Sequence, residues 1–191
     1  MDPIEHIDVP GDSTLAILLS AQERGHDLFY YTPNDLTLNE GRLLARGAGL
    51  TVRDDPHDHF DLHDPRVVDL EDMDVVLLRQ DPPFDMGYIT TTHLLERIHP
   101  KTLVVNDPAH VRNAPEKIFV LDYQDLMPPT MVTRSLDEVK AFREKYRDII
   151  IKPLYGNGGA AVFRLPWGDS NLASLVEMFH LSWREPFMVQ Q

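Results

Sequence analysis

The stretch that decides the fold reads Asp148-Ile-Ile-Ile-Lys-Pro-Leu-Tyr-Gly-Asn-Gly-Gly-Ala-Ala-Val-Phe-Arg164. A run of β-branched residues ends in Lys152, a glycine-rich turn follows, and a second apolar run closes the unit. The glycines at 156, 158 and 159 permit positive φ and close approach of the backbone, so main-chain amides can converge on phosphate oxygens. A lysine at the end of a strand adds a positive charge beside them. The pattern therefore indicates a polyphosphate-binding loop, and a simple β-hairpin whose lysine extends into solvent is the alternative.

Composition and charge limit the class of protein. The chain has 191 residues, enough for one large domain or two small ones. Its 31 acidic residues against 18 basic ones give a net charge of -13, which repels nucleic acid and anionic membranes. We therefore expect neither as a partner, although a local cluster of lysines and amides can still hold a nucleotide.

Three features that the sequence lacks indicate the cellular compartment in which the protein is expected. The chain contains no cysteine, which excludes disulfides and a thiol nucleophile and is compatible with a reducing compartment. No apolar run approaches the roughly 18 residues of a membrane-spanning helix, and the N-terminus lacks the pattern of a signal peptide. We predict a cytoplasmic protein.

Strands alternating with helices are predicted over residues 1–112, which favours an α/β domain with a parallel sheet. The apolar run 73–79 is typical of a strand buried on both faces. Short strands are expected around Gly41 and Gly47, and a loop is expected over the acidic stretch 54–70. The other predicted elements are strands at 27–31 and 102–106 and helices starting near Ser13, Tyr88 and Pro115.

The second part of the chain, residues 113–191, predicts a small α+β unit. Prolines at 115, 128 and 129 mark the boundary region. Ser135-Leu-Asp-Glu138 is a capping-box pattern that opens a helix running to about Arg147. A short strand at 131–133, a helix near 170–181 and a final strand at 187–190 surround the strand–loop–strand stretch.

The two ends of the sequence are expected to be internal to a longer protein. No strand precedes the first helix, although a βαβ sheet normally opens with one. The chain ends inside the apolar run Met188-Val-Gln-Gln191.

Polar residues follow the predicted buried strand in the turn Arg79-Gln-Asp-Pro-Pro-Phe-Asp85. Ligands of open α/β sheets sit outside the carboxyl ends of strands. Arg79 can hold a carboxylate there and Asp81 or Asp85 an ammonium group, while the double proline stiffens the turn. The alternative is a rigid loop with an internal Arg–Asp pair.

Three weaker candidates have simpler explanations beside them. Asp2 and Ser13 place polar groups near a helix start, where anions bind, but helix capping explains them equally. Lys117 lies near the start of its predicted helix, where a positive charge is mildly unfavourable for the helix dipole. It therefore either has a functional role at this position or is an ordinary surface lysine. The histidines between His57 and His63 alternate with aspartates, a composition that can bind metal but is more often a solvated loop. We assign no metal ligand and no catalytic residue.

Six motifs in order resemble the prokaryotic glutathione synthetases of the ATP-grasp superfamily. They are Met1-Asp-Pro-Ile, Asp12 to His26, Leu78 to Asp85, Val105-Asn-Asp-Pro with Asn113-Ala-Pro-Glu-Lys-Ile-Phe, Ile151 to Gly159, and Met188-Val-Gln-Gln191. An accidental match would have to fit every spacing at once. The resemblance covers the chain except for about residues 40–70.

The resemblance implies a Rossmann-like pre-ATP-grasp domain without its first strand, followed by a small α+β ATP-grasp lid, with the C-terminal ATP-grasp domain missing. It implies glutathione synthase activity for the intact protein. ATP phosphorylates the cysteinyl carboxylate of γ-glutamylcysteine, and the amine of glycine attacks the acyl phosphate. Magnesium would be a cofactor with its ligands outside this chain, the intact enzyme would be a homotetramer, and this portion alone would be inactive.

The resemblance also implies roles for individual residues. The nucleotide would be contacted by Lys117, Lys152, the mobile loop with Gly156, Asn157, Gly158 and Gly159, and, at the approach to the adenine hinge, Gln190 and Gln191. The peptide substrate would face Asp2, Ser13, Arg79, Asp81 and Asp85. Two other interpretations stay open: another ATP-grasp carboxylate–amine ligase, and a non-catalytic module that binds a small ligand.

Overall fold

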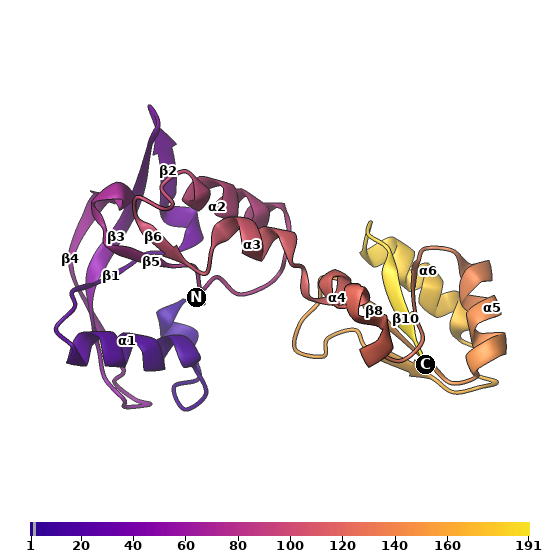
Figure 1. Cartoon of the computed structure of the whole chain (residues 1–191). Coiled ribbons are helices and arrows are strands. Elements are labelled where there is room, and N and C mark those ends of the chain that lie inside the picture. The colour runs from indigo at the N-terminus through magenta and orange to yellow at the C-terminus, as the bar shows by residue number, and fades with distance from the viewer. Residues whose placement is uncertain (2) are drawn as a thin grey trace. The chain divides into compact units, whose positions relative to one another are not determined.

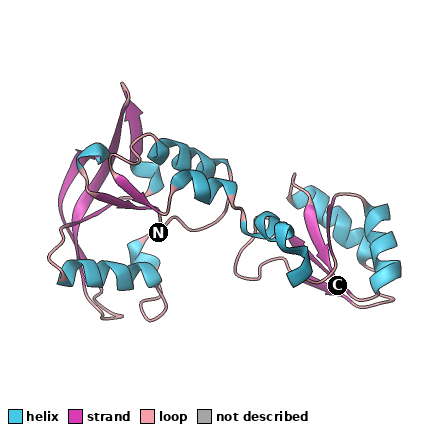
Figure 2. Ribbon diagram, viewed as in Figure 1, coloured by secondary structure: helices cyan, strands magenta, loops and turns pink. Residues whose placement is uncertain are grey.

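The computed structural model describes residue 1 and residues 3–191, which divide into two compact units (Figure 1). The first unit comprises Met1–Asp81 and Met86–Asn113, and the second comprises Pro82–Asp85 and Ala114–Gln191. Both mix helices with strands (Figure 2), so the predicted α/β class is confirmed. Within the described residues, no helix combines the length and the apolar character needed to cross a bilayer.

A four-stranded antiparallel sheet in the order β7–β10–β8–β9 is the centre of the second unit. Its strands are β7 (Thr130–Thr133), β8 (Ile149–Pro153), β9 (Phe163–Leu165) and β10 (Phe187–Gln190). The helices α5 (Leu136–Tyr146) and α6 (Leu172–Ser182) lie beside it in Figure 1. The glycine-rich loop joins β8 to β9, as the sequence predicts.

The alternation of side chains along β8 and β10 gives this sheet two different faces. Ile149 and Ile151 of β8 are buried together with Phe187 and Val189 of β10. The helices complete this core with Val139 of α5 and with Leu172, Val176 and Phe179 of α6. Lys152 therefore lies on the face opposite the helices, because it alternates with the buried isoleucines.

The start of α5 differs in detail from the predicted capping box. Ser135 is the N-cap, and its Oγ accepts a hydrogen bond from the Glu138 amide at 3.3 Å. The Ser135 amide, however, donates to Thr133 Oγ1 at 2.9 Å. A neighbouring threonine thus fills the place that the Glu138 side chain has in a capping box.

The first unit contains a second antiparallel sheet. Its strands are β1 (Leu28–Tyr30), β2 (Leu36–Asn39), β3 (Arg42–Val52) and β4 (Phe60–Asp69), with β3 pairing with the other three. The loop predicted over 54–70 is wrong, because most of it is β4. The side chains of β4 are largely exposed, and the strand is formed by main-chain pairing with β3. The sequence of β4 therefore lacks the alternation of apolar residues from which a strand is normally predicted.

Gly47 lies inside β3 and does not separate two short strands as predicted. A Cβ atom at Gly47 would stand 2.1 Å from the Tyr30 carbonyl oxygen, and one at Gly49 would stand 2.3 Å from His63 Cε1. These glycines allow close packing across the sheet at an irregularity of the β3–β4 register. Gly41 does form a turn, with φ of 85° between β2 and β3.

Parallel pairing in the described residues is confined to β5 (Val75–Leu77) and β6 (Leu103–Val105). The parallel sheet predicted over residues 1–112 is therefore wrong apart from this pair. The helices of this unit are α1 (Ser13–Glu23), α2 (Met86–Glu96) and α3 (Pro108–Asn113). Asp12 caps α1, accepting a hydrogen bond from the Leu15 amide at 2.6 Å, and Gly25 follows the end of α1 with φ of 82°.

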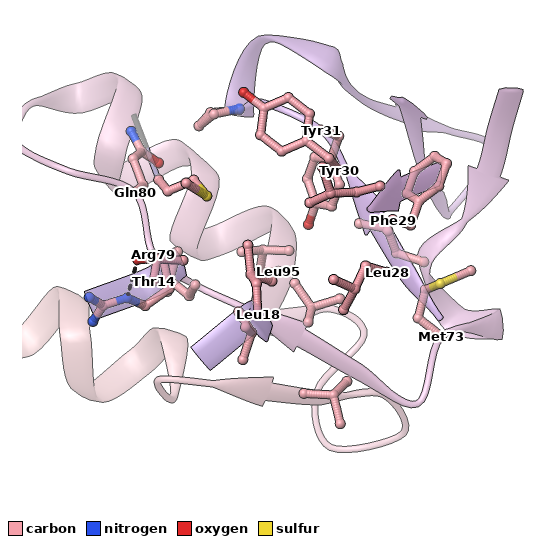
Figure 3. Close-up of a pocket in the computed structure, with 18 of the residues that line it drawn as sticks. Thr14, Leu18, Leu28, Phe29, Tyr30, Tyr31, Met73, Arg79, Gln80 and Leu95 are labelled. Carbon is pink, nitrogen blue, oxygen red and sulfur yellow. Dashed lines mark hydrogen bonds between the residues drawn. The ribbon is translucent and has the colours of Figure 1, made fainter. Parts of the chain in front are cut away.

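An apolar slot of about 180 Å³ is lined by residues from both sheets of the first unit. Figure 3 shows Tyr30 and Tyr31 on one side of it and Arg79 and Gln80 on the other. Val75 of β5 is 49% exposed, which contradicts the expected burial on both faces. Gln80 Oε1 is buried without a hydrogen-bond partner in the part of the chain described.

Replacing Phe179 tests the core of the second unit. Its ring lies 4.8 Å from that of Trp183 and 5.2 Å from that of Phe187, between centroids. We expect Phe179→Ala to lower the free energy of unfolding by about 3–5 kcal/mol, because it leaves a cavity. The two tryptophans, Trp167 and Trp183, both belong to this unit, so urea unfolding followed by their fluorescence reports it.

The matched control is Leu181→Ala on the same helix, where the side chain is 83% exposed. This change should alter the free energy of unfolding by no more than about 0.5 kcal/mol. Equal effects of the two substitutions would contradict the assignment of Phe179 to the core.

Candidate functional site

The open face of the β8–β10 sheet carries a cleft of about 450 Å³. All residues predicted to contact a nucleotide line it, namely Lys117, Lys152, Gly156, Asn157, Gly158, Gly159, Gln190 and Gln191. They come from the start of α4 (Glu116–Phe119), from β8 and the loop that follows it, and from the end of the chain. The structure thus brings together residues that lie up to 74 positions apart in sequence (117 to 191), and their role in binding stays a prediction.

Lys152 is held in an environment that favours an anionic partner. In β8 it stands opposite Met188 of β10, on the face away from the helices. Partial burial lowers the pKa of Lys152, and the neighbouring charge of Lys117 lowers it further, while Glu116 acts in the opposite direction. A partly desolvated cation next to a second cation gains stability when an anion binds between them.

Lys117 fastens the beginning of the glycine-rich loop. Its ammonium group donates a hydrogen bond to the main-chain carbonyl of Gly156. Because an ammonium group has three donors, this bond leaves donors for a ligand in the same cleft. This tertiary contact gives Lys117 a structural role in the second unit beyond that of a surface lysine.

The glycines of the loop are required for two different reasons. Gly158 and Gly159 have positive φ, 58° and 76°, which side-chain-bearing residues rarely adopt. At Gly156 a Cβ atom would lie 2.8 Å from Cγ of Pro153, so this glycine allows close packing of the loop on the end of β8. Ala160 donates from its amide to the Asn157 carbonyl at 3.1 Å, which closes the turn.

Several lining residues were missed from the sequence. They are Glu116, Pro128, Ile150, Pro153, Ala160 and Val162. Ile150 could have been found, because it lies two residues before Lys152 and shares its face of the strand. Pro128 carries no such signal, since it reaches the cleft through the pairing of β7 with β10, where the Gln191 amide donates to the Pro129 carbonyl at 3.1 Å.

Arg79 and Ser13 of the predicted peptide site are in direct contact in the first unit. Arg79 donates from Nη2 to Ser13 Oγ at 2.7 Å. It also donates from Nε to Thr14 Oγ1 at 3.0 Å (Figure 3). The guanidinium group thus lies at the N-terminus of α1, where the helix dipole also favours an anion. Thr14 was not among the residues assigned to the peptide site, and nothing in the sequence signals its bond to Arg79.

The other residues predicted to face the peptide are divided. Asp81 belongs to the first unit, where burial raises the pKa of Tyr88 and Asp81 contributes to that shift. Asp85 belongs to the second unit, and its amide donates to the Pro83 carbonyl at 3.0 Å. In the same unit Phe84 stacks on Tyr155, with ring centroids 5.9 Å apart, directly before the glycine-rich loop. Asp2 lies outside the described residues.

The histidine-rich segment is arranged through other contacts. His59 Nε2 lies 2.6 Å from the Ile4 carbonyl oxygen, and Arg53 forms ion pairs with Asp58 and Asp61 at 2.8 and 2.6 Å. Among residues 1 and 3–191, no group of three or more His, Asp or Glu side chains is placed to hold a metal ion.

The fold is that of the ATP-grasp ligases. The macrocyclase MdnC of Microcystis aeruginosa, solved with its precursor peptide, superposes with a TM-score of 0.56 at 16% identity over 94% of this chain and 62% of its own. The ATP-grasp ligase PsnB superposes with a TM-score of 0.52 at 18% identity over 95% of this chain and 61% of its own. At such identities the likeness shows the fold alone.

The sequence resolves the family. Residues 1–112 match the N-terminal domain of prokaryotic glutathione synthetase, and residues 116–191 match its ATP-grasp domain. The chain belongs to the prokaryotic glutathione synthetase family, and the resemblance noted from the motifs is confirmed. The glutathione synthetases of Bradyrhizobium diazoefficiens and Brucella melitensis are each 59% identical over all 191 residues. The chain spans 61% of the length of each of these relatives.

The environment of Lys152 leads to a prediction about its titration. In an NMR titration with 13C-labelled lysine, Lys152 should lose its proton at a lower pH than an ordinary lysine, because burial and Lys117 disfavour its charge. Lys117→Gln should move this pKa upward by removing the second cation. A pKa of Lys152 at or above the ordinary value, unchanged in Lys117→Gln, would contradict the described cleft.

Proposed function

We propose that this chain is the substrate- and nucleotide-binding portion of a glutathione synthase, an ATP-dependent carboxylate–amine ligase. The observation that carries the proposal is the convergence of Lys117, Lys152 and the glycine-rich loop on one cleft in a member of this family. In the proposed reaction ATP phosphorylates the cysteinyl carboxylate of γ-glutamylcysteine. Glycine then attacks the acyl phosphate, which yields glutathione, ADP and phosphate.

The cleft residues would carry out the electrostatic part of this reaction. Phosphoryl transfer needs positive charge around the transferring group, and an acyl phosphate must be kept from water. Lys117 and Lys152 would neutralise phosphate oxygens, while the amides of the loop from Gly156 to Gly159 close over them. Gln190 and Gln191 would lie at the approach to the adenine ring, beside the apolar side chain of Ile150.

Arg79 is the best candidate for holding the peptide substrate. We propose that its guanidinium group, oriented by Ser13 and Thr14, receives a carboxylate of γ-glutamylcysteine. Asp81 or Asp85 is proposed to hold the ammonium group of the peptide, and Asp2 is proposed to face the same substrate. In this proposal residues 1–112 are the substrate domain and residues 113–191 the central lid of the ATP-grasp fold.

We propose that magnesium does not fit the described residues that line the cleft. Glu116 is the one carboxylate among the described residues that line the cleft, and hard cations prefer several oxygen ligands. We therefore propose that the ligands of the magnesium used with ATP lie outside this chain. The longer protein is further proposed to be a cytoplasmic homotetramer that binds neither nucleic acid nor membrane, in keeping with the net charge of -13.

Two other functions remain to be separated by experiment. Another ATP-grasp ligase would use a different acceptor or carboxylate, and a non-catalytic module would bind a ligand without turnover. A longer protein whose activity requires both γ-glutamylcysteine and glycine would support the proposed function over both.

Nucleotide binding by the chain tests the roles of the lysines. By isothermal titration calorimetry with ATP, we expect Lys152→Gln to weaken binding about 10–100-fold, because a charge-assisted bond to phosphate is lost. Lys140→Gln is the matched control, since this lysine lies on α5 and pairs with Asp137 at 3.2 Å. Equal affinity of all three proteins would contradict the proposed role of Lys152.

The pH dependence of the same binding follows from the lowered pKa of Lys152. The ammonium form binds phosphate and exists only below this pKa, which lies below the ordinary value of 10.5. ATP affinity should therefore fall as the pH rises through the lowered pKa of Lys152, at a lower pH than the one at which an ordinary exposed lysine loses its charge. Lys152→Arg should flatten this fall, because arginine keeps its charge.

The chain alone should form no glutathione, because residues for magnesium and for the acyl phosphate are proposed to lie elsewhere. A chimera that continues this chain with the region following the match in the Bradyrhizobium relative should form it from γ-glutamylcysteine, glycine and ATP, measured by chromatography. Glutathione formation by the 191-residue chain itself would overturn this part of the proposal.

A further inference from the structure

The position of Asn157 in the cleft favours a spontaneous covalent change of its side chain. Asn157 is directly followed by Gly158, and none of the other five asparagines of the chain precedes a glycine. The main-chain nitrogen of the next residue can attack an asparagine side chain, and glycine hinders this attack least because it lacks a Cβ atom. Both residues are exposed and line the cleft together with Lys117 and Lys152, all within the second unit.

The turn that begins at Asn157 leaves both reacting groups free. The Asn157 carbonyl accepts a hydrogen bond from the Ala160 amide at 3.1 Å, and Gly158 and Gly159 have φ of 58° and 76°, as in a type I′ turn. Among residues 1 and 3–191, neither the Asn157 side chain nor the Gly158 amide has a hydrogen-bond partner. Opening of one hydrogen bond therefore lets the two groups rotate toward each other.

The two lysines of the cleft favour this attack. The reaction begins when the Gly158 amide gives up its proton, and negative charge then passes from the nitrogen to the side-chain oxygen of Asn157. Positive charge fixed in the same cleft by Lys117 and Lys152 stabilises such an anion. The cleft thus combines an accessible side chain, a free main-chain nitrogen and a cationic environment.

We propose that Asn157 is a deamidation site and that its conversion weakens nucleotide binding, a consequence that rests on the proposed function. The Gly158 nitrogen forms a bond to Cγ of Asn157, the Cγ–Nδ2 bond breaks, and the proton of the Gly158 amide leaves with ammonia. Water then opens the five-membered succinimide at one of its two carbonyl carbons. The product is aspartate or isoaspartate, in which the side-chain carbon has entered the main chain.

Both products oppose a polyphosphate in the cleft. The new carboxylate pairs with the cations of Lys117 and Lys152 and repels phosphate oxygens. Isoaspartate also lengthens the main chain before Gly158 by one carbon, which moves the loop amides out of the turn geometry. The residue at position 157 therefore limits the time for which the protein keeps its full affinity for a nucleotide.

Peptide mass spectrometry during incubation at mildly alkaline pH tests the modification itself. Asn157 should gain the mass of an amide-to-acid conversion well before the other five asparagines do. Because the turn opens readily, Asn157 in the folded chain should react no more than about tenfold more slowly than in the same chain unfolded in urea. Saturating ATP should slow the reaction, since its phosphates would engage the Gly158 amide.

Calorimetric titration with ATP tests the consequence. The affinity should fall in step with the modified fraction, and Asn157→Asp should lower it about tenfold from the start, because one negative charge is added beside the phosphates. Asn171→Asp is the matched control, since it adds the same charge at the exposed N-cap of α6 and should change the affinity less than about twofold. Asn157→Gln should gain no mass at position 157 and should keep its own initial affinity throughout the incubation.

Three outcomes would overturn the proposal. The first is reaction of Asn157 at the same rate as the other asparagines, or its suppression by folding. The second is an unchanged reaction rate under saturating ATP in a chain that binds ATP. The third is full conversion of Asn157 without loss of ATP affinity. If the fresh chain binds no ATP, the proposed function fails, while the mass measurement still decides whether Asn157 is the deamidation site.

Discussion

The two-residue period of β8 is the constraint on which the second unit depends. Successive side chains of a strand point to opposite faces, so burial of Ile149 and Ile151 under α5 and α6 places Ile150 and Lys152 on the other face. A shift of the strand by one residue would drive a lysine into an apolar core, at a high cost in free energy. The same strand register therefore both packs the isoleucines into the core and places Lys152 on the open face of the sheet.

The cleft that results is electrostatically unfavourable until an anion enters it. Two ammonium groups lie close enough that Lys117 lowers the pKa of Lys152, in a chain whose net charge is -13. The negative charge of Glu116 acts in the opposite direction on the pKa of Lys152. The Gly156 carbonyl accepts a hydrogen bond from the Lys117 ammonium group. The arrangement concentrates positive charge in one cleft of a chain that is acidic overall. In the proposed function this distribution would favour a small polyanion over nucleic acid.

Local signals in the sequence predicted the second unit well. The β-branched run, the glycines and Ser135 each report a local preference, and β8, the loop and the start of α5 follow them. The sequence also placed Lys152 and the loop together, because they are adjacent. It could not place Pro128 in the cleft or Thr14 beside Arg79, since those contacts depend on pairing between distant segments.

The errors in the first unit have a common physical cause. Strand β4 forms by pairing its main chain with β3 while its side chains remain in solvent, so no apolar alternation marks it. The run 73–79 predicts a doubly buried strand, yet residues of β5 line the slot and Val75 is exposed. Apolar composition alone therefore did not show which side of β5 is covered.

Mapping of amide NMR shifts during titration with ATP, and separately with inorganic triphosphate, tests the central claim most directly. A cationic cleft on the open face of the β8–β10 sheet predicts that both ligands shift the signals of Lys117, Lys152 and Gly156–Gly159. Only ATP should shift Gln190 and Gln191, and the core of Ile149, Ile151 and Phe179 should stay unchanged. Shifts confined to the first unit, or an absence of shifts at saturating ATP, would contradict the account.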